Sequence, residues 1–137
     1  MSKIDFYATV LVSAVVLIAL RCDNPTEKQM SENPTIEWAP FKLSPGVDEA
    51  TLFEASNDVQ TEFISKQSGF IKRELLKGRD NQWVDIIHWK SRDEAEQASK
   101  NAMNSAICQK YFSLMTSFEQ NDPNAGVFHF EQVKTYE

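Results

Sequence analysis

The order of strand-like and helix-like segments limits the folds open to this chain of 137 residues. Thr35–Leu43 alternates like a short strand, and Pro40 within it favours an edge position or a bulge, because proline lacks a ladder donor. From Asp48, the expected N-cap, the period becomes helical, and the pattern ends near Ser68-Gly69. The apolar stripe of this helix is Leu52, Ala55, Val59 and Phe63.

Two further strands, a second helical region and a final strand complete the order. Phe70–Lys77 and Trp83–Trp89 are joined by a short polar loop, which is typical of a hairpin. Ser91 and Glu94 match a capping box at the start of the next helix. The remaining features are, in order, a small apolar stripe at Ala95, Ala98 and Ala102, helical turns over Ile107–Phe118, a loop over Asn121–Gly126 and a strand over Val127–Tyr136.

The resulting βαββαβ order, with the second helix split in two, predicts an α+β domain of the ferredoxin-like type over residues 35–137. We expect a four-stranded antiparallel sheet with the helices on one face. Aromatic residues make both sheet faces apolar, so the face without helices needs a cover, and a second copy of the chain is its commonest cover. The aromatic residues of the predicted strands are Trp38, Phe41, Phe70, Trp83, Trp89, Phe128, Phe130 and Tyr136.

Residues 1–22 have the pattern of a signal peptide or membrane anchor. Phe6–Leu20 is uncharged and apolar, which fits the apolar region of an export signal, whereas a spanning helix needs about 20 such residues. The polar residues 23–34 predict a disordered tether. This start is similar to that of bacterial lipoproteins, in which a cysteine, here Cys22, is lipidated, although Arg21 stands where a small residue is usual.

Three fates of this N-terminal segment stay open: lipidation at Cys22, cleavage elsewhere with release, or retention as an anchor. We expect an exported domain that is membrane-tethered, periplasmic or extracellular. The alternative is an anchored domain that faces the cytoplasm, because Lys3 is a feeble orientation cue and Arg21 opposes it.

Charge and cysteine content exclude several classes of function. The net charge of −6 and the absence of a cluster of basic residues argue against a sequence-independent grip on nucleic acid. Cys108 is the only cysteine of the predicted domain, so no disulfide forms within it, and we expect it to be a small buried hydrophobic residue. No spacing of cysteines or histidines matches a metal site, so no metal is expected.

Three short motifs resemble the dimeric α+β barrel superfamily, in particular its branch similar to antibiotic biosynthesis monooxygenases (ABM). They are Ser68-Gly69-Phe70, Trp89-Lys90-Ser91 and Asp93-Glu94-Ala95. The resemblance covers about Ile36 to Val133 and implies that the domain forms a dimeric α+β barrel. The family includes cofactor-free oxygenases of polyphenolic aromatics and haem-degrading enzymes. The latter carry an Asn on the first strand and a His on the helix after the tryptophan; this chain has neither, so no cofactor is expected.

Asp85 is the most informative candidate for chemistry. Alternation along its strand places it on one face with Trp83 and Trp89, and His88 on the other. A buried carboxylate must find a donor or take up a proton, so two interpretations stay open. Asp85 can abstract a proton from a phenol, which would then react with dioxygen. It can instead form a structural ion pair with Arg73 or Lys72, and this second interpretation is favoured.

The predicted site combines these residues with the last helix. His88 and His129 are the only histidines, and we take His88 as the second candidate for proton transfer. The sequence thus predicts a cofactor-independent monooxygenase-like enzyme for a small aromatic or oxidisable molecule; the alternative is a non-catalytic module that binds a small hydrophobic ligand or only dimerises. A cavity with Asp85 on its wall would favour the enzyme, and a filled core with Asp85 saturated by Arg73 the module. The predicted ligand-binding residues are Trp83, Asp85, Trp89, Tyr111 and Phe112.

Overall fold

A computed structural model describes residues 33–116, 122 and 125–137 of the chain. The expected signal or anchor, Cys22, nearly all of the expected tether and most of the loop before the last strand lie outside these residues. Within the described ranges, no helix combines the length and the hydropathy that a membrane span requires.

The described chain alternates strands and helices in the expected order. The elements are β1 (Thr35–Leu43), α1 (Glu49–Glu62), the 3₁₀ turn η1 (Ile64–Lys66), β2 (Phe70–Lys77), β3 (Gln82–Trp89), α2 (Arg92–Ala102), α3 (Ala106–Phe112), β4 (Met115–Thr116) and β5 (Phe128–Glu131).

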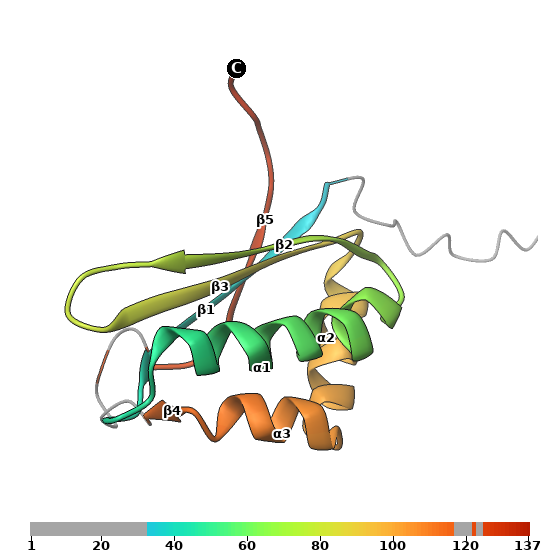
Figure 1. Cartoon of the computed structure of the whole chain (residues 1–137). Helices are drawn as coiled ribbons and strands as arrows, with labels where there is room; N and C mark the ends of the chain where they lie inside the picture. The colour runs from blue at the N-terminus through green and yellow to red at the C-terminus, as the bar shows by residue number, and fades with distance from the viewer. Residues whose placement is uncertain (1–32, 117–121, 123–124) are drawn as a thin grey trace, which may run out of the picture.

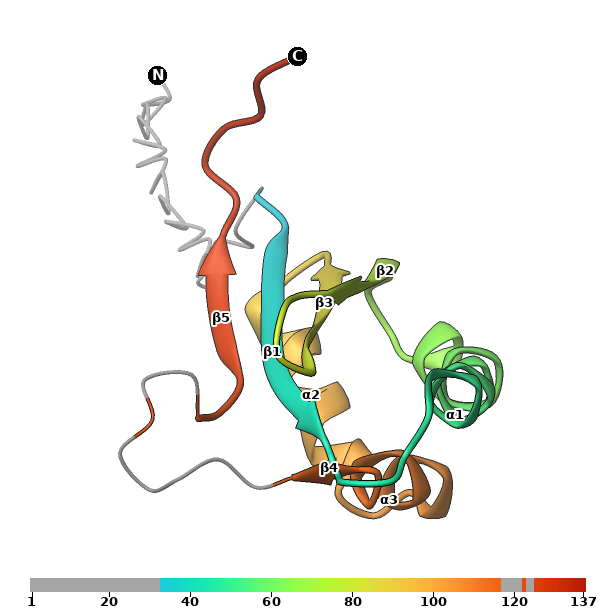
Figure 2. The ribbon, with the colours of Figure 1, turned by 60° about the vertical axis from the view of Figure 1, so that its left-hand side comes forward.

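All strands join one antiparallel sheet, and the three α-helices cover one of its faces (Figures 1 and 2). The strand order is β2-β3-β1-β4, and β5 also pairs with β1. The predicted α+β, ferredoxin-like fold is therefore confirmed. One difference is that the fourth position of the sheet is divided between β4, which pairs with Lys42 and Leu43, and β5, which pairs with residues 35–38.

The position of Pro40 differs from the expectation of an edge strand or bulge. β1 is central, and Pro40 pairs with Val84 of β3 in a regular register. On the other side of β1, the β5 pairing ends at Trp38 and the β4 pairing begins at Lys42. Pro40 lies in the gap between these two pairings, so a central strand can accept a residue that has no ladder donor.

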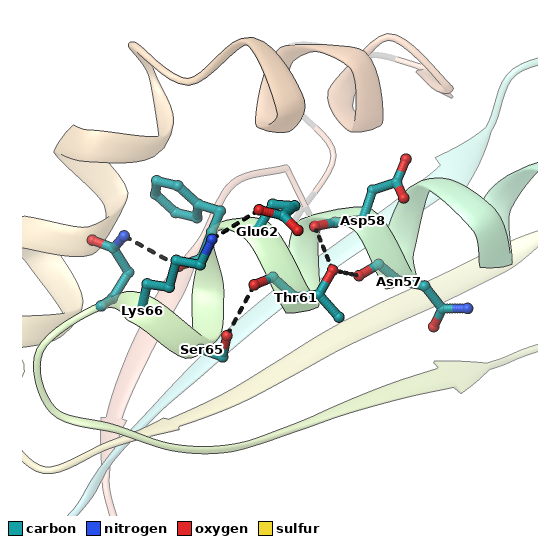
Figure 3. Close-up of polar contacts among 8 residues, drawn as sticks. Asn57, Asp58, Thr61, Glu62, Ser65 and Lys66 are labelled. Carbon is teal, nitrogen blue, oxygen red and sulfur yellow. Dashed lines mark hydrogen bonds and ion pairs between the residues drawn. The ribbon is translucent and has the colours of Figure 1, made fainter.

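Helix α1 begins as expected and ends earlier. The Asp48 carboxylate accepts a hydrogen bond from the Thr51 N–H at 2.8 Å, as an N-cap should. Instead of continuing to Ser68, the chain tightens into η1 after Glu62. Figure 3 shows side chains of η1 that contact the last turn of α1: the Ser65 hydroxyl donates to the Thr61 carbonyl, and Lys66 pairs with Glu62.

The C-terminal third departs most from the predicted boundaries. The predicted helical turns over Ile107–Phe118 end at Phe112, because the chain then enters the sheet: the Ser44 N–H donates to the Leu114 carbonyl, and Met115 pairs with Leu43. The last strand ends at Glu131 rather than Tyr136. Its partner β1 begins at Thr35, so no β1 residue remains to pair beyond that point.

Capping of α2 depends on a tight approach between Gly69 and Glu94. The Ser91 hydroxyl accepts from the Glu94 N–H, and the Glu94 carboxylate accepts hydrogen bonds from the hydroxyls of Ser68 and Ser91, both at 3.0 Å. Gly69 has a φ of +74°, and an added Cβ would overlap the Glu94 carboxylate. Gly46, with a φ of +85°, has nothing within 4 Å of such a Cβ.

This contrast between the two glycines gives a first prediction. We expect Gly46→Ala to cost about 1–2 kcal/mol of unfolding free energy, the penalty of a left-handed conformation. Gly69→Ala should cost about 1–2 kcal/mol more than Gly46→Ala, because it also displaces the Glu94 carboxylate from its two hydroxyl donors. Urea unfolding of both variants measures the difference; equal losses would show that the Glu94 cap contributes nothing.

Candidate functional site

A cavity of about 330 Å³ lies between the sheet and the helices. Its volume falls within the range of about 300–1,000 Å³ typical of small-molecule sites. The exposed side chains of Met103, Phe112 and Val127 are part of its lining, so the cavity reaches the surface. Most of the wall is apolar, and the polar exceptions are few. The lining includes Glu37, Ala39 and Phe41 from β1, Asp85, Ile87 and Trp89 from β3, and Ala98, Ala102, Cys108 and Tyr111 from the helices.

Asp85 lies on this wall and is held by three donors. Arg73 of β2 grips it with two hydrogen bonds, Nε to Oδ1 at 2.7 Å and Nη2 to Oδ2 at 2.6 Å. The Tyr111 hydroxyl of α3 donates to Oδ2 at 3.0 Å. The third guanidinium nitrogen of Arg73, Nη1, donates to the Ser56 carbonyl at 2.9 Å. Of the two interpretations open for Asp85, the structure shows the ion pair with Arg73.

The Asp85–Arg73 pair is buried, which sets the state of its neighbour Tyr111. The Arg73 and Asp85 side chains are 6% and 9% exposed. Burial raises the pKa of the Tyr111 hydroxyl well above its ordinary value, and the negative charge of Asp85 raises it further. Tyr111 therefore keeps its proton and acts as a donor to Asp85.

A second buried carboxylate, Glu37 of β1, lies on the same wall. The Trp89 indole Nε1–H donates to Glu37 Oε2 at 3.2 Å. His129 of β5 pairs with Glu37 in register, and its Nε2 is 3.3 Å from the same oxygen. No hydrogen bond from the described residues reaches the other oxygen, Oε1. Both oxygens of Asp85 accept hydrogen bonds, whereas Glu37 keeps one oxygen without a donor among the described residues.

Burial raises the pKa of the Glu37 carboxyl above its ordinary value. The hydrogen bonds from His129 and Trp89 oppose this shift, and the negative charge of Asp85 adds to it. A carboxyl whose pKa moves upward is better matched to proton transfer near neutral pH than an ordinary one. Glu37 therefore has both a raised pKa and an oxygen without a hydrogen-bond donor among the described residues. Asp85 has no such oxygen, because Arg73 and Tyr111 donate to both of its oxygens.

The raised pKa of Glu37 makes a prediction about stability. A raised native pKa contributes stability that is present below the unfolded pKa and lost as the pH rises through the native value. We therefore expect the melting temperature of Glu37→Gln, relative to the native protein, to increase as the pH rises from 4 to 8. Thermal melts across this range measure it. The matched control is Glu54→Gln at an exposed position of α1, and an equally large trend in this variant would show that the effect does not come from the buried site.

The structure brings together most of the residues that the sequence proposed for the site. Asp85, Trp89, Tyr111 and Phe112 line the cavity. Trp83 does not: it is buried beside Phe53 of α1, with ring centroids 6.0 Å apart, away from the cavity wall.

His88 also lies away from the cavity. It is on the outer face of the sheet, where its Nε2 is 3.2 Å from Glu74. The prediction that His88 takes part in chemistry in this pocket thus has no geometric support.

Sequence reasoning missed Glu37 and did not connect it with His129. A signal was present, because alternation along Thr35–Leu43 places Glu37 on the same face as Phe41 and Leu43. The described part of the chain has no group of three or more His, Cys, Asp or Glu side chains that could hold a metal ion.

Comparison with known proteins identifies the fold. No protein-family model and no curated protein sequence matches the chain. Solved structures do match. One is SnoaB, a cofactor-independent oxygenase from Streptomyces nogalater, with a TM-score of 0.59 and 19% identity over 75% of this chain and 96% of that one.

Two further matches are described as candidate antibiotic biosynthesis monooxygenases. The protein from Caulobacter crescentus has a TM-score of 0.58 and 11% identity over 77% of this chain and 94% of its own. The protein from Bordetella bronchiseptica has a TM-score of 0.54 and 17% identity over 74% of this chain and 99% of its own. The chain therefore has the ferredoxin-like α+β fold of ABM-type proteins, as the sequence motifs indicated. At these identities the likeness establishes the fold alone.

Proposed function

We propose that the domain binds a small aromatic or oxidisable molecule in the cavity between sheet and helices and promotes its reaction with dioxygen, without a cofactor. The observation that carries the proposal is the cavity itself: a largely apolar space of about 330 Å³ that reaches the surface and has carboxylates on its wall. An apolar wall suits an aromatic ring, and a few buried polar groups fix its orientation. The likeness to SnoaB, a cofactor-independent oxygenase, supports the same class of reaction.

A second candidate function has one specific observation in its favour. Asp85, for which a role as a base was one of two open interpretations, has its oxygens occupied by Arg73 and Tyr111. If no other group moves a proton, the domain is a module that binds a small hydrophobic ligand without transforming it. The two functions share the cavity and differ in dioxygen consumption.

Ligand binding and dioxygen uptake, measured on one panel of hydroquinones and other phenols, test both functions. We expect at least one compound to bind, as followed by calorimetry, and to drive dioxygen uptake in the native protein. Ala102→Phe places a ring in the cavity and should weaken binding about tenfold or more. The matched control is Ala50→Phe, at an exposed position of α1, which should bind normally. Binding without dioxygen uptake would exclude the enzyme and support the non-catalytic binding module. No binding at all would overturn both functions.

We also propose that a second copy of the chain covers the outer face of the sheet. The helices leave this face bare (Figure 2), and it carries exposed apolar side chains on three strands: Trp38 of β1, Leu76 of β2 and Phe130 of β5. These side chains are 36%, 45% and 56% exposed. Val84 and Ile86 of β3 lie between them on the same face. An exposed apolar patch of this kind is typical of an interface.

Light scattering on residues 33–137 tests the dimer. We expect twice the monomer mass at micromolar concentration, and Trp38→Lys should shift the protein towards monomer by placing a charge in the apolar face. The matched control is Met103→Lys on the helix side, where the side chain is 68% exposed. A native protein that remains monomeric at high concentration would rule out this assembly.

We propose, finally, that the N-terminal segment exports the domain and tethers it to a membrane. The support is the apolar run Phe6–Leu20 followed by Cys22. Labelling with a fatty-acid analogue in a bacterial host should mark the native chain and not Cys22→Ser if lipidation is the mode of attachment. An unlabelled native chain found in the soluble fraction would exclude a tether.

A further inference from the structure

The Glu37–His129 pair connects the cavity with the outside of the domain. Glu37 lines the cavity, whereas His129 lies beside it on the neighbouring strand β5 and is not part of the lining. The two side chains are 11% and 14% exposed, so His129 retains contact with solvent from a position next to a buried carboxylate. The order from the inside outwards is cavity, Glu37, His129, solvent.

The two oxygens of the Glu37 carboxylate differ in their hydrogen bonds. Both hydrogen-bonding neighbours of Glu37, Trp89 and His129, approach Oε2. Oε1 receives no hydrogen bond from the described residues, so it is the oxygen with free capacity to accept one from a hydroxyl. Trp89 fixes the carboxylate from β3, so its position does not depend on the ligand.

We propose that Glu37 accepts the proton of a ring hydroxyl on the bound aromatic molecule and that His129 passes this proton on to solvent. This inference rests on the proposed function, because it assumes that the cavity binds such a molecule. It narrows the ligand class to hydroxyaromatics, in which loss of the hydroxyl proton produces an electron-rich anion.

The step balances with the groups present. The ligand O–H bond breaks and its electron pair stays on oxygen as a phenolate, while the proton goes to the Glu37 carboxylate. Glu37 then gives a proton to the His129 imidazole, which becomes an imidazolium and releases it to solvent. Glu37 ends as a carboxylate, ready for another transfer. Glu37 touches the ligand and is the catalytic residue; His129 acts through it and is a positioning and relay residue.

Several charged and titratable groups surround this pair. Asp85 faces Glu37 from β3 and raises its pKa. From α2, Glu96 pairs with Arg92, and this hydrogen bond is the main reason why the pKa of the Glu96 carboxyl lies below its ordinary value; the charge of His129 makes a smaller contribution in the same direction. Tyr111 and Cys108 of α3 lie on the same cavity wall and both have raised pKa values because they are buried, so both stay protonated and do not compete as bases.

A phenol whose anion is coloured, 4-nitrophenol, tests the proposal in the full domain. After a pH jump, we expect the phenolate band of bound 4-nitrophenol to appear rapidly in the native protein. Glu37→Gln should slow its appearance about tenfold or more, because it removes the base that takes the proton from the bound hydroxyl. His129→Gln should slow it in the same direction, because it keeps a hydrogen-bonding side chain and removes the ring that passes the proton to solvent.

The other histidine of the chain is the matched control. His88 also lies beside a glutamate, Glu74, but on the opposite face of the sheet. His88→Gln should leave the rate at which the bound phenolate appears unchanged. A thermal melt of each variant establishes that it is folded, and His129→Gln alone decides the matter if Glu37→Gln does not fold.

The outcomes separate this inference from the function on which it rests. If 4-nitrophenol and the other phenols fail to bind by equilibrium dialysis, the proposed function fails. If 4-nitrophenol binds and stays protonated after the pH jump, or if its phenolate band appears at the same rate in the native protein, Glu37→Gln and His129→Gln, only the assignment of Glu37 and His129 is wrong.

Discussion

Replacing Arg73 by methionine should destabilise the domain by about 3–5 kcal/mol, because it leaves the buried Asp85 carboxylate without its cation. The Arg73 side chain is 6% exposed and supplies two of the three hydrogen bonds to Asp85. Only the Tyr111 hydroxyl would remain as a donor. Urea unfolding of the variant measures the loss.

The neighbouring lysine provides the control for Arg73→Met. Lys72 also pairs with an acidic residue, Glu74, but their side chains are 54% and 45% exposed. Lys72→Met should therefore change the unfolding free energy by only about 0–1 kcal/mol. A similar loss for both variants would contradict the importance of burial.

A double variant tests whether the cost of Arg73→Met lies in the unpaired charge. Combining Arg73→Met with Asp85→Leu removes both charges and should recover much of the loss, because apolar side chains of similar volume often replace a buried ion pair without destabilisation. The Tyr111 hydroxyl would then lack its acceptor, so Tyr111→Phe should recover about 1–3 kcal/mol more. A double variant no more stable than Arg73→Met would instead point to lost packing.

The parts of the fold that the sequence could predict are those decided by short-range patterns. The buried stripe of α1, including Leu52 at 0% exposure, follows from helical spacing, and the Ser91 cap follows from a local motif. The segment from Leu114 to Thr116 could not be assigned in this way. A short apolar run fits a helix or a strand, and its pairing with Leu43 of β1 decides the outcome.

Most of the residues that the sequence proposed for the site line the cavity, but the contacts between them could not be predicted. Alternation placed Asp85 and Trp89 on one face correctly, but it could not separate Trp89 from Trp83, which shares that face and lies outside the cavity. The Glu37–His129 pair joins residues 92 positions apart, and only the register of β5 on β1 brings them together. No local pattern contains this register, since the last strand is far from β1 along the chain.

Trp89→Ala should destabilise the domain by about 3–5 kcal/mol, the usual cost of removing a large aromatic side chain from a core. Trp89 is 1% exposed and is the largest fully buried side chain among the residues that the structure describes. Its ring meets Phe70 edge-on, with centroids 6.1 Å apart, and its indole N–H is a donor to Glu37. Trp89→Phe should cost less than Trp89→Ala, because it keeps a ring in the core and gives up the hydrogen bond.

Trp38 provides the comparison that separates core packing from assembly. Its side chain lies on the outer face of the sheet and is 36% exposed in the single chain. The loss caused by Trp89→Ala should be independent of protein concentration, because all its contacts lie within one chain. If a second copy covers the outer face, the loss caused by Trp38→Ala should grow as the protein concentration rises, since dimer stability depends on mass action. A small loss for Trp38→Ala at every concentration would mean that the outer face stays uncovered, while the role of Trp89 in the core would stand.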